Sequence, residues 1–430
     1  MESPFVVQIF DKAFKWLGNL ADPIRLDLTP QFNAVGTGEI EVSASDEMLP
    51  FMLAKGARCR ITYKGGHEMS GPLRHPTGKV AEFGTVIFQV EDDYRLLPNT
   101  LGWVAPDKNL SPVSMSDTAQ SNIYFNSGAT VTLSKAHYYL TGGDSAEGAI
   151  KDLISVNMIE RLGRPVTVAP NQFRIPFPYA SDDILPVRMA PLDEALAGLL
   201  LETGLGLSLQ HDGVSPTITA EVWEPTTWPL DLTVDSGVVL DGDWSQQYPT
   251  ATRMIIGGPG ENVARAFWEV RDATGIEDEY GDIIEVFRDA TGSTLNWPDT
   301  LADQYRIAKY YLLRDEVSTA DKNAFRIYLN AAGAKGLSDG APTAGLSLSL
   351  SETPQFQYAP GGFRRGDHIS VMANGVRFTD QILAVNLTWN KTTGATATPQ
   401  VGDRTDDPDV LFARAISQLA AAQRRLSTSR

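Results

Sequence analysis

The chain has 430 residues, of which 42% are hydrophobic and 21% are charged. At roughly 100–200 residues per domain this length predicts two to four domains, and the composition is that of a globular protein rather than a disordered one. The net charge of −17, from 53 acidic and 36 basic residues, argues against general nucleic-acid binding, because phosphate contacts need clustered Lys and Arg.

The sequence also lacks the signals of a secreted or membrane protein. Its longest dense apolar patch, 195–201, is far shorter than the ~18 residues of a membrane span. The start "MESPFVVQIFDK" has no basic segment followed by an apolar core, so it predicts no signal peptide, and we expect synthesis in a cytoplasm. The single cysteine, Cys59, excludes an intramolecular disulfide; it shares one side of an alternating segment with Ile61 and Tyr63, which predicts a buried position.

Residues 1–105 are typical of a first β-domain. "IRLDL" and "EIEVSA" alternate apolar and polar residues with the period of a half-buried strand. "RCRITYKGGHEMSGPL" predicts a hairpin with Gly65-Gly66 at its turn, and "GTVIFQVEDDYRLL" predicts a further strand. Short strands separated by turn residues favour a small barrel or sandwich.

Residues 106–228 predict an α/β insert, since the composition turns polar and proline-containing near Pro106. A first helix is expected to begin at Asp144, with Glu147 as the reciprocal capping residue, and to end at Gly163. A second helix is expected between Pro191 and Gly204. The buried face of the first helix should consist of Ala149, Ile150, Leu153, Ile154, Met158 and Leu162.

Residues 229–400 predict a second barrel-like β-domain that contains one helix, at 300–313. "TATRMIIGGPGENVARAFWEVRD" indicates two strands around a glycine-rich turn, and "GLSLSLSE" alternates strictly. Asn374-Gly375 is a strong signal for a two-residue hairpin turn, which would pair Ala373 with Val376 and Val371 with Phe378. A third strand is expected to bury Leu383, Val385, Leu387 and Trp389.

Residues 401–430 predict a C-terminal helix. Asp407 suits the N-cap and Pro408 the first helical position. An apolar stripe then recurs at helical spacing, which is typical of a short coiled coil or of a helix that packs on its own domain or frays. If the stripe binds a partner, its contact residues are Phe412, Ile416, Leu419 and Leu426.

We find no motif that predicts a catalytic, metal or cofactor site. The histidines His67, His75, His137, His211 and His368 have no metal-ligand spacing, and surface or loop positions are expected for all five. The best candidates for acid chemistry are the pairs Asp92-Asp93 and Asp182-Asp183 and the cluster 277–282, which we interpret as solvated loop residues. The "RGD" at 365–367 is interpreted locally, as a strand entrance where Gly permits unusual dihedrals and Asp bonds to nearby backbone.

Two segments together resemble a known family. "PIRLDLTPQFNAVGTGEIEVSA" is similar to the opening of siphophage minor tail proteins of the baseplate-hub type, including those with an attached tail lysin. "FRRGDHISVMANGVRFTDQILAVNLTW" resembles their closing segment of a Gly-Asp entry, a hairpin and an alternating strand. The order of elements between them also agrees, so the resemblance extends from about Pro23 to Trp389.

The resemblance implies a fold and a function. The fold would be β-rich α+β, with two barrel-like domains of the tail-tube type around an α/β insert, followed by the C-terminal helix. Three chains would present six such modules and close a hexameric tube at the virion tail tip. The implied partners are the tail tube or distal tail protein ring, the tape measure protein and receptor-binding tip proteins. DNA would pass through the ring without specific binding, for which the acidic balance is suited.

Two other functions remain open from the sequence. A tail-associated cell-wall hydrolase would require two carboxylates across a cleft. A host-glycan binding module would require exposed aromatic side chains in a groove, and tryptophans such as Trp223, Trp228 and Trp244 are candidates for stacking on sugars.

Overall fold

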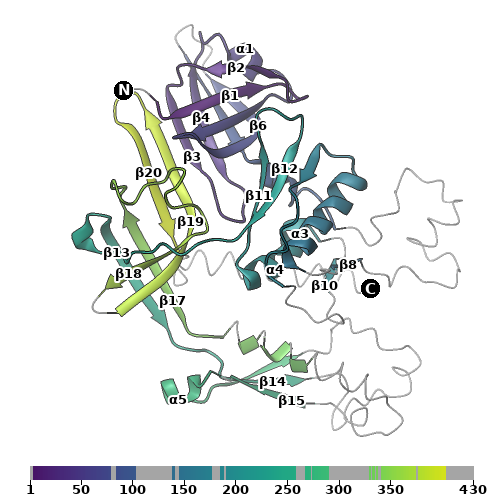
Figure 1. Ribbon diagram of the computed structural model, residues 1–430, viewed down its shortest axis with the longest axis vertical. Helices are drawn as coiled ribbons and strands as arrows, with labels where there is room; N and C mark the ends of the chain where they lie inside the picture. Colours follow the sequence, from purple (N-terminus) through teal and green to yellow (C-terminus); the bar gives the residue numbers. More distant parts are fainter. Residues whose placement is uncertain are drawn as a thin grey trace, which may run out of the picture. The chain divides into compact units, whose positions relative to one another are not determined.

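The structure is a computed structural model, shown in Figure 1. It describes residues 3–78, 84–102, 138–140, 145–176, 185–187, 190–257, 267–272, 274–289 and 329–402, apart from positions 331, 335, 338–339 and 374–375. By their contacts the residues divide into two compact units, of which one contains 1–243 and 346–430 and the other 244–345. The fold is β-rich with few helices, as the α+β prediction requires.

A ten-stranded sheet dominates the larger unit and is assembled from both ends of the chain. Its order is β18-β19-β3-β4-β7-β6-β5-β1-β2, with β20 also paired to β19. The end strands β18 and β2 do not pair with each other among the described residues, so the sheet is not a closed barrel. The strands are β1 (Phe5–Phe10), β2 (Trp16–Leu20), β3 (Arg25–Thr29), β4 (Thr37–Ser43), β5 (Arg58–Tyr63), β6 (Gly66–Gly78), β7 (Thr85–Glu91), β18 (His368–Ala373), β19 (Val376–Asn390) and β20 (Gly394–Val401).

The predicted strands of the first hundred residues are confirmed. Alternation buries Leu26 and Leu28 on β3 and Ile40 on β4, and Cys59 is buried as expected. The turn between β5 and β6 differs from the prediction by one residue, because Tyr63 pairs with Gly66 and the loop is Lys64-Gly65. Both loop residues have positive φ, 46° and 81°, which is the geometry that a two-residue hairpin turn needs. Two short helical segments, α1 (Leu49–Met52) and η1 (Asp93–Leu96), lie in the connections.

The C-terminal hairpin has the predicted register, with Ala373 opposite Val376 and Val371 opposite Phe378. The turn residues themselves lie outside the described part. The prediction of a separate third strand is wrong, because 376–390 form the single strand β19. A bulge between Ile382 and Ala384 shifts the alternation. The buried residues therefore change from even positions, such as Ile382, to odd positions, such as Val385, and Leu383 is only partly buried.

A smaller sheet and two helices in the same unit enclose a second core. The sheet consists of β11 (Gly206–His211), β12 (Ile218–Trp223) and β9 (Val166–Val168), and the helices are α3 (Ala146–Ile154) and α4 (Leu192–Thr203). Helix α3 is capped by the Ser145 hydroxyl, which accepts from the Gly148 N–H, and not by Asp144, which lies outside the described residues. A π-helical segment, Ser155–Glu160, follows α3.

The π-helical segment explains one wrong prediction on the first helix. Ala149, Ile150, Leu153, Ile154 and Met158 are buried as expected, whereas Leu162 is 44% exposed. Hydrogen bonds from residue i+5 to residue i widen the turn, so the apolar stripe no longer follows the α-helical period beyond Met158. The second helix agrees with its prediction: Pro191 precedes it, and Gly204 ends it with a φ of 68°.

The smaller unit contains a three-stranded sheet of β14 (Arg253–Gly257), β15 (Phe267–Arg271) and β16 (Glu285–Asp289), with helix α5 (Ile276–Tyr280). The antiparallel pairing of β14 with β15 confirms the predicted strand pair. The turn between them and the helix expected at 300–313 lie outside the described residues. Strands β13 (Val239–Gln247) and β17 (Thr343–Leu350) pair with each other and contain the two points at which the chain crosses between units.

The remaining short elements are η4 (Val234–Ser236) and the strands β8 (Tyr138–Leu140) and β10 (Leu185–Val187), which pair with each other. Within the described part of the chain, no helix has the length and apolar composition needed to cross a membrane.

Candidate functional site

The acidic pair Asp92-Asp93 is buried, contrary to the prediction of solvated loop carboxylates. Asp93 accepts hydrogen bonds from Arg58 Nη2 at 2.6 Å and from the Ser70 hydroxyl at 2.8 Å. Asp92 accepts from the backbone N–H groups of Gly36 and Tyr94, at 2.9 and 3.1 Å, and so caps η1. Both carboxylates therefore hold β5, β6 and the end of β7 together.

The prediction for the histidines is wrong at His211, whose relative exposure is only 1%. The burial of His211 follows from the alternation of β11, which turns Leu207, Leu209 and His211 toward the core. The backbone N–H of His211 donates to the Ser70 hydroxyl at 2.9 Å, and its ring packs edge-on against Phe10. Burial lowers the pKa of the imidazole, so the ring is neutral in the core.

The local interpretation of "RGD" is confirmed. Gly366 has a φ of 91°, and the Asp367 carboxylate accepts from the N–H groups of Thr226 and Arg364, at 2.9 and 2.8 Å. A Cβ on Gly366 would lie 2.4 Å from the Phe32 ring, so the glycine is also needed for close packing. The side chain of Asp367 is buried and unavailable as a recognition group.

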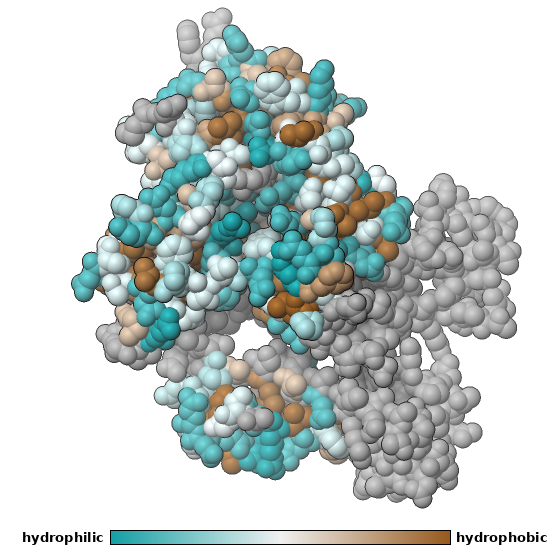
Figure 2. All heavy atoms as spheres, viewed as in Figure 1, coloured by the Kyte–Doolittle hydropathy of each residue, from teal (hydrophilic) through white to brown (hydrophobic). Residues whose placement is uncertain are grey.

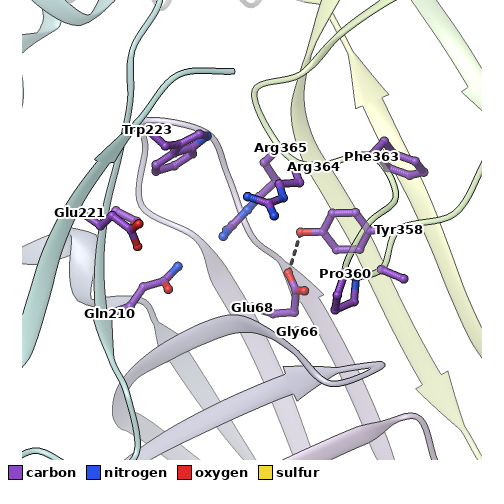
Figure 3. A pocket seen from close by; sticks show the side chains of 12 residues that line it. Gly66, Glu68, Gln210, Glu221, Trp223, Tyr358, Pro360, Phe363, Arg364 and Arg365 are labelled. Atoms are coloured by element: carbon purple, nitrogen blue, oxygen red, sulfur yellow. Dashed lines mark hydrogen bonds between the residues drawn. The ribbon is translucent and has the colours of Figure 1, made fainter. Parts of the chain in front are cut away.

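A polar pocket of about 300 Å³ lies in the larger unit, between β6, the β11–β12 hairpin and the loop that precedes β18 (Figure 3). Its polar and aromatic lining includes Glu68, Gln210, Glu221, Trp223, Tyr358 and Arg365. In the close-up, Gln210, Glu221 and Trp223 face Glu68, Tyr358 and Arg365 across the space. The pocket thus brings together side chains from three regions that are far apart in the sequence.

One wall of the pocket is the outward face of the β11–β12 hairpin. The register places Ser208 opposite Glu221 and Gly206 opposite Trp223. The indole of Trp223 lies over Gly206, where a Cβ would come within 2.3 Å of the ring, and it meets Phe32 edge-on at 5.9 Å. The absence of a side chain at Gly206 and the contact with Phe32 together fix the orientation of this tryptophan.

The opposite wall carries a buried carboxylate, Glu68, which is 8% exposed and accepts a hydrogen bond from Tyr358 Oη at 2.6 Å. Burial raises the pKa of Glu68, although the positive charge of Arg365 and the bond from Tyr358 oppose this effect. Burial also raises the pKa of the Tyr358 hydroxyl well above its ordinary value. Burial therefore favours the protonated form of both groups at the base of the pocket.

The remaining predicted site residues are distributed elsewhere. Phe412, Ile416, Leu419 and Leu426, like Asp182-Asp183, lie outside the described residues. In the cluster 277–282, Glu277 pairs with Arg253 in the smaller unit, with Oε1 2.6 Å from Nε. No group of three or more His, Cys, Asp or Glu side chains in the described ranges has the arrangement of a metal site.

Sequence reasoning named Trp223 as a candidate for stacking on sugars, but it did not predict the pocket, because no motif marks it. The signal that was present is "ITAEVW", in which Ile218, Ala220 and Val222 alternate with the polar face that carries Glu221 and Trp223. That alternation predicts a strand with one solvated face, but it does not predict which distant loop approaches the face. The contribution of Tyr358 and Arg365 depends on a connection that alternation patterns do not describe.

The β-rich fold joins strands from near both ends of the chain in one sheet, and its acidic pair Asp92-Asp93 connects buried elements. A family model covers nearly the whole chain: residues 6–403 match the Siphovirus ReqiPepy6 Gp37-like protein family. The chain belongs to this family, and the resemblance to siphophage tail proteins that the sequence suggests is confirmed. A search among curated proteins finds no match.

Several solved structures are similar over most of the chain. The 43 kDa tail protein of prophage MuSo2 from Shewanella oneidensis has 13% identity and a TM-score of 0.48, with 92% of this chain and 97% of that chain covered. Prophage tail protein gp18 from Listeria monocytogenes EGD-e has 9% identity and a TM-score of 0.46, with 96% of this chain and 99% of that chain covered. A chain of the phage P2 baseplate, in its activated conformation with Ca, has 10% identity and a TM-score of 0.38, with 94% of this chain and 100% of that chain covered.

Proposed function

We propose that this chain is a structural protein of the virion and forms the baseplate hub at the distal end of a long-tailed phage tail. Three copies would close the tail tube as a ring, connect it to receptor-binding tip proteins and let DNA pass at infection. The observation that carries the proposal is the family match over 6–403, which runs from the first strand of the ten-stranded sheet to its last. The role is structural rather than catalytic.

The outer edge of β2 is the best candidate for contact between copies. Strand β2 pairs only with β1, and its other edge makes no backbone hydrogen bond to any segment within the described ranges. Trp16, at the start of β2, is 55% exposed. An unpaired strand edge is a template for pairing with a second chain. The edge strand β20, by contrast, contains Pro399, which removes one backbone donor.

Contact through a strand edge does not require a broad apolar face. Figure 2 shows hydrophobic residues as small separate patches among hydrophilic ones on the face drawn. Large apolar faces are what obligate interfaces of the core type need. Strand pairing at β2 needs only backbone groups and a few anchoring side chains, of which Trp16 is the largest.

The net charge and the C-terminal apolar stripe account for the remaining parts of the proposal. A net charge of −17 suits a ring through which DNA slides, because a negatively charged protein surface repels the phosphates of DNA. We assign the contact with tip proteins to the stripe Phe412, Ile416, Leu419 and Leu426, and the contacts with the distal tail protein ring and tape measure protein to the assembled ring. The hub would be synthesised and assembled in the host cytoplasm.

Light scattering on the purified chain tests the proposed trimer. We expect a mass near three times 46.8 kDa over a concentration series. Trp16→Lys should reduce the mass to that of a monomer, because it places a charge at the proposed contact. Leu201→Lys is the matched control, since Leu201 is 87% exposed on α4 and is not part of β2. A trimer that persists in Trp16→Lys would exclude β2 as the contact, and a dimer or tetramer would contradict the ring.

A further inference from the structure

We propose that the pocket between β6, the β11–β12 hairpin and the loop at 358–365 binds an acidic sugar, a pyranose ring that carries one carboxylate. This goes beyond the hub role, since the pocket lies within one chain and needs no second copy. Three features support the assignment: a fixed aromatic platform, polar groups suited to hydroxyls, and a guanidinium that forms no hydrogen bond or salt bridge with another described residue.

The platform is Trp223. Its indole is fixed between Gly206, over which it lies, and Phe32, and it lines the pocket while only partly buried. An aromatic ring held in one orientation provides a flat apolar surface at little entropic cost on binding. The apolar face of a pyranose ring is the complement of such a surface.

The side chains that would bind the sugar hydroxyls lie on β11 and β12, the two strands of the hairpin that carries Trp223. Ser208, Gln210 and Glu221 share the outward face with Trp223, because β11 and β12 alternate in register. The amide of Gln210 both donates and accepts, whereas the Glu221 carboxylate accepts only. A ring bearing several hydroxyls, each of them a donor and an acceptor, can satisfy both kinds of group at once.

The carboxylate would bind Arg365. This guanidinium forms no hydrogen bond or salt bridge with another described residue, although it lines the pocket and is more than half buried. The nearby Glu68 carboxylate accepts from Tyr358 instead. A guanidinium is a planar fork of donors that matches a carboxylate in a bidentate arrangement. Gly366 and the buried Asp367 fix the backbone beside it, so the arginine is held where the ligand would be.

Size and charge exclude the main alternatives. A volume of about 300 Å³ is at the lower end for ligand pockets, which suits one sugar residue rather than an extended chain. The Glu221 carboxylate repels a doubly charged phosphate group more strongly than a singly charged carboxylate, which needs only one guanidinium. Arg364 and Arg365 also line the space and would repel a metal cation.

The test uses the full chain and two probes that differ only in the carboxylate: methyl β-D-glucuronide and methyl β-D-glucoside. Binding is measured by calorimetry and by ligand-observed NMR, and the mass of the protein is recorded in the same samples. We expect the glucuronide to bind more tightly by about 10–100-fold, the range for hydrogen bonds to a charged group. Equal affinity for the two glycosides, or no binding of either, would overturn the proposal.

Variants locate the binding. Arg365→Gln should remove the preference for the glucuronide, and Arg365→Lys should retain part of it, since the charge remains but the fork is lost. Trp223→Leu should weaken both glycosides, whereas Trp223→Phe keeps an aromatic platform. Arg377→Gln is the control, because Arg377 is exposed outside the pocket and pairs with Asp231. Retention of the preference in a folded Arg365→Gln variant would refute the assignment, whatever oligomeric mass is found.

Discussion

Replacing Asp93 by Asn should be among the most destabilising single changes in the larger unit. The Asp93 side chain is fully buried, and Arg58, its ionic partner, has a side chain that is only 10% exposed. Ser70 donates to the same carboxylate and in turn accepts from the His211 N–H, so the pair links β5 and β6 to β11. Asn would leave the guanidinium buried with no opposite charge, which costs roughly 3–5 kcal/mol.

Chemical denaturation followed by tryptophan fluorescence measures this loss. Calorimetry should show the transition of the larger unit lowered by about 6–10 °C, taking ~2 °C per kcal/mol for a large domain. The double variant Arg58→Met/Asp93→Leu should recover much of the loss, because it removes both charges and Arg58 Nε already lacks a hydrogen-bond partner. A loss below about 1 kcal/mol for Asp93→Asn would show that the pair behaves like a solvated surface bridge.

Three further predictions concern other buried groups. Burial raises the pKa of Asp92 to about 7, so the fold favours the protonated acid. Stability should therefore fall as pH rises from about 4 to about 7, and an unchanged slope in Asp92→Asn would contradict this. Gly71→Ala should unfold the sheet, because the new Cβ would clash with the Glu91 carbonyl oxygen. Gly198→Ala, in open space on α4, should instead stabilise the fold by about 0.5–1 kcal/mol. Equal melting temperatures of the two variants would refute the packing argument. Burial would raise the pKa of Glu147, but bonds from the Lys151 ammonium and a backbone N–H lower it overall, so its contribution should be lost only when acid reaches that lowered pKa. Glu147→Gln should cost about 3–5 kcal/mol at pH 7 and less below that pKa, and a cost independent of pH would argue against a buried ion pair.

Local patterns predicted most strands correctly because each half-buried strand carries its own period. The hairpin of β18 and β19 is the clearest case, since Val371 and Phe378 face each other as the turn at 374–375 requires. The same reasoning failed where one residue breaks the period. The bulge after Ile382 and the π-helical segment after Ile154 both insert an extra residue, and neither leaves a mark in composition.

Residues buried by distant segments were the other source of error. Asp92-Asp93 looks like a solvated loop, and it is buried because Arg58 and the backbone of Gly36 satisfy its oxygens. His211 belongs to a strand whose alternation was not identified, so its burial between Phe10 and Phe14 was not predicted. The pocket depends on the approach of 358–365 to β12, which only the three-dimensional fold determines.

A reconstruction of the tail tip by electron cryo-microscopy, from a phage particle that contains this chain, tests the hub proposal most directly. The hub proposal predicts three copies around the tail axis at the end of the tube, with β2 of each copy at a subunit boundary and the ring lumen wide enough for DNA. Density for the chain along the tail shaft, in a peripheral fibre or nowhere in the particle would contradict it.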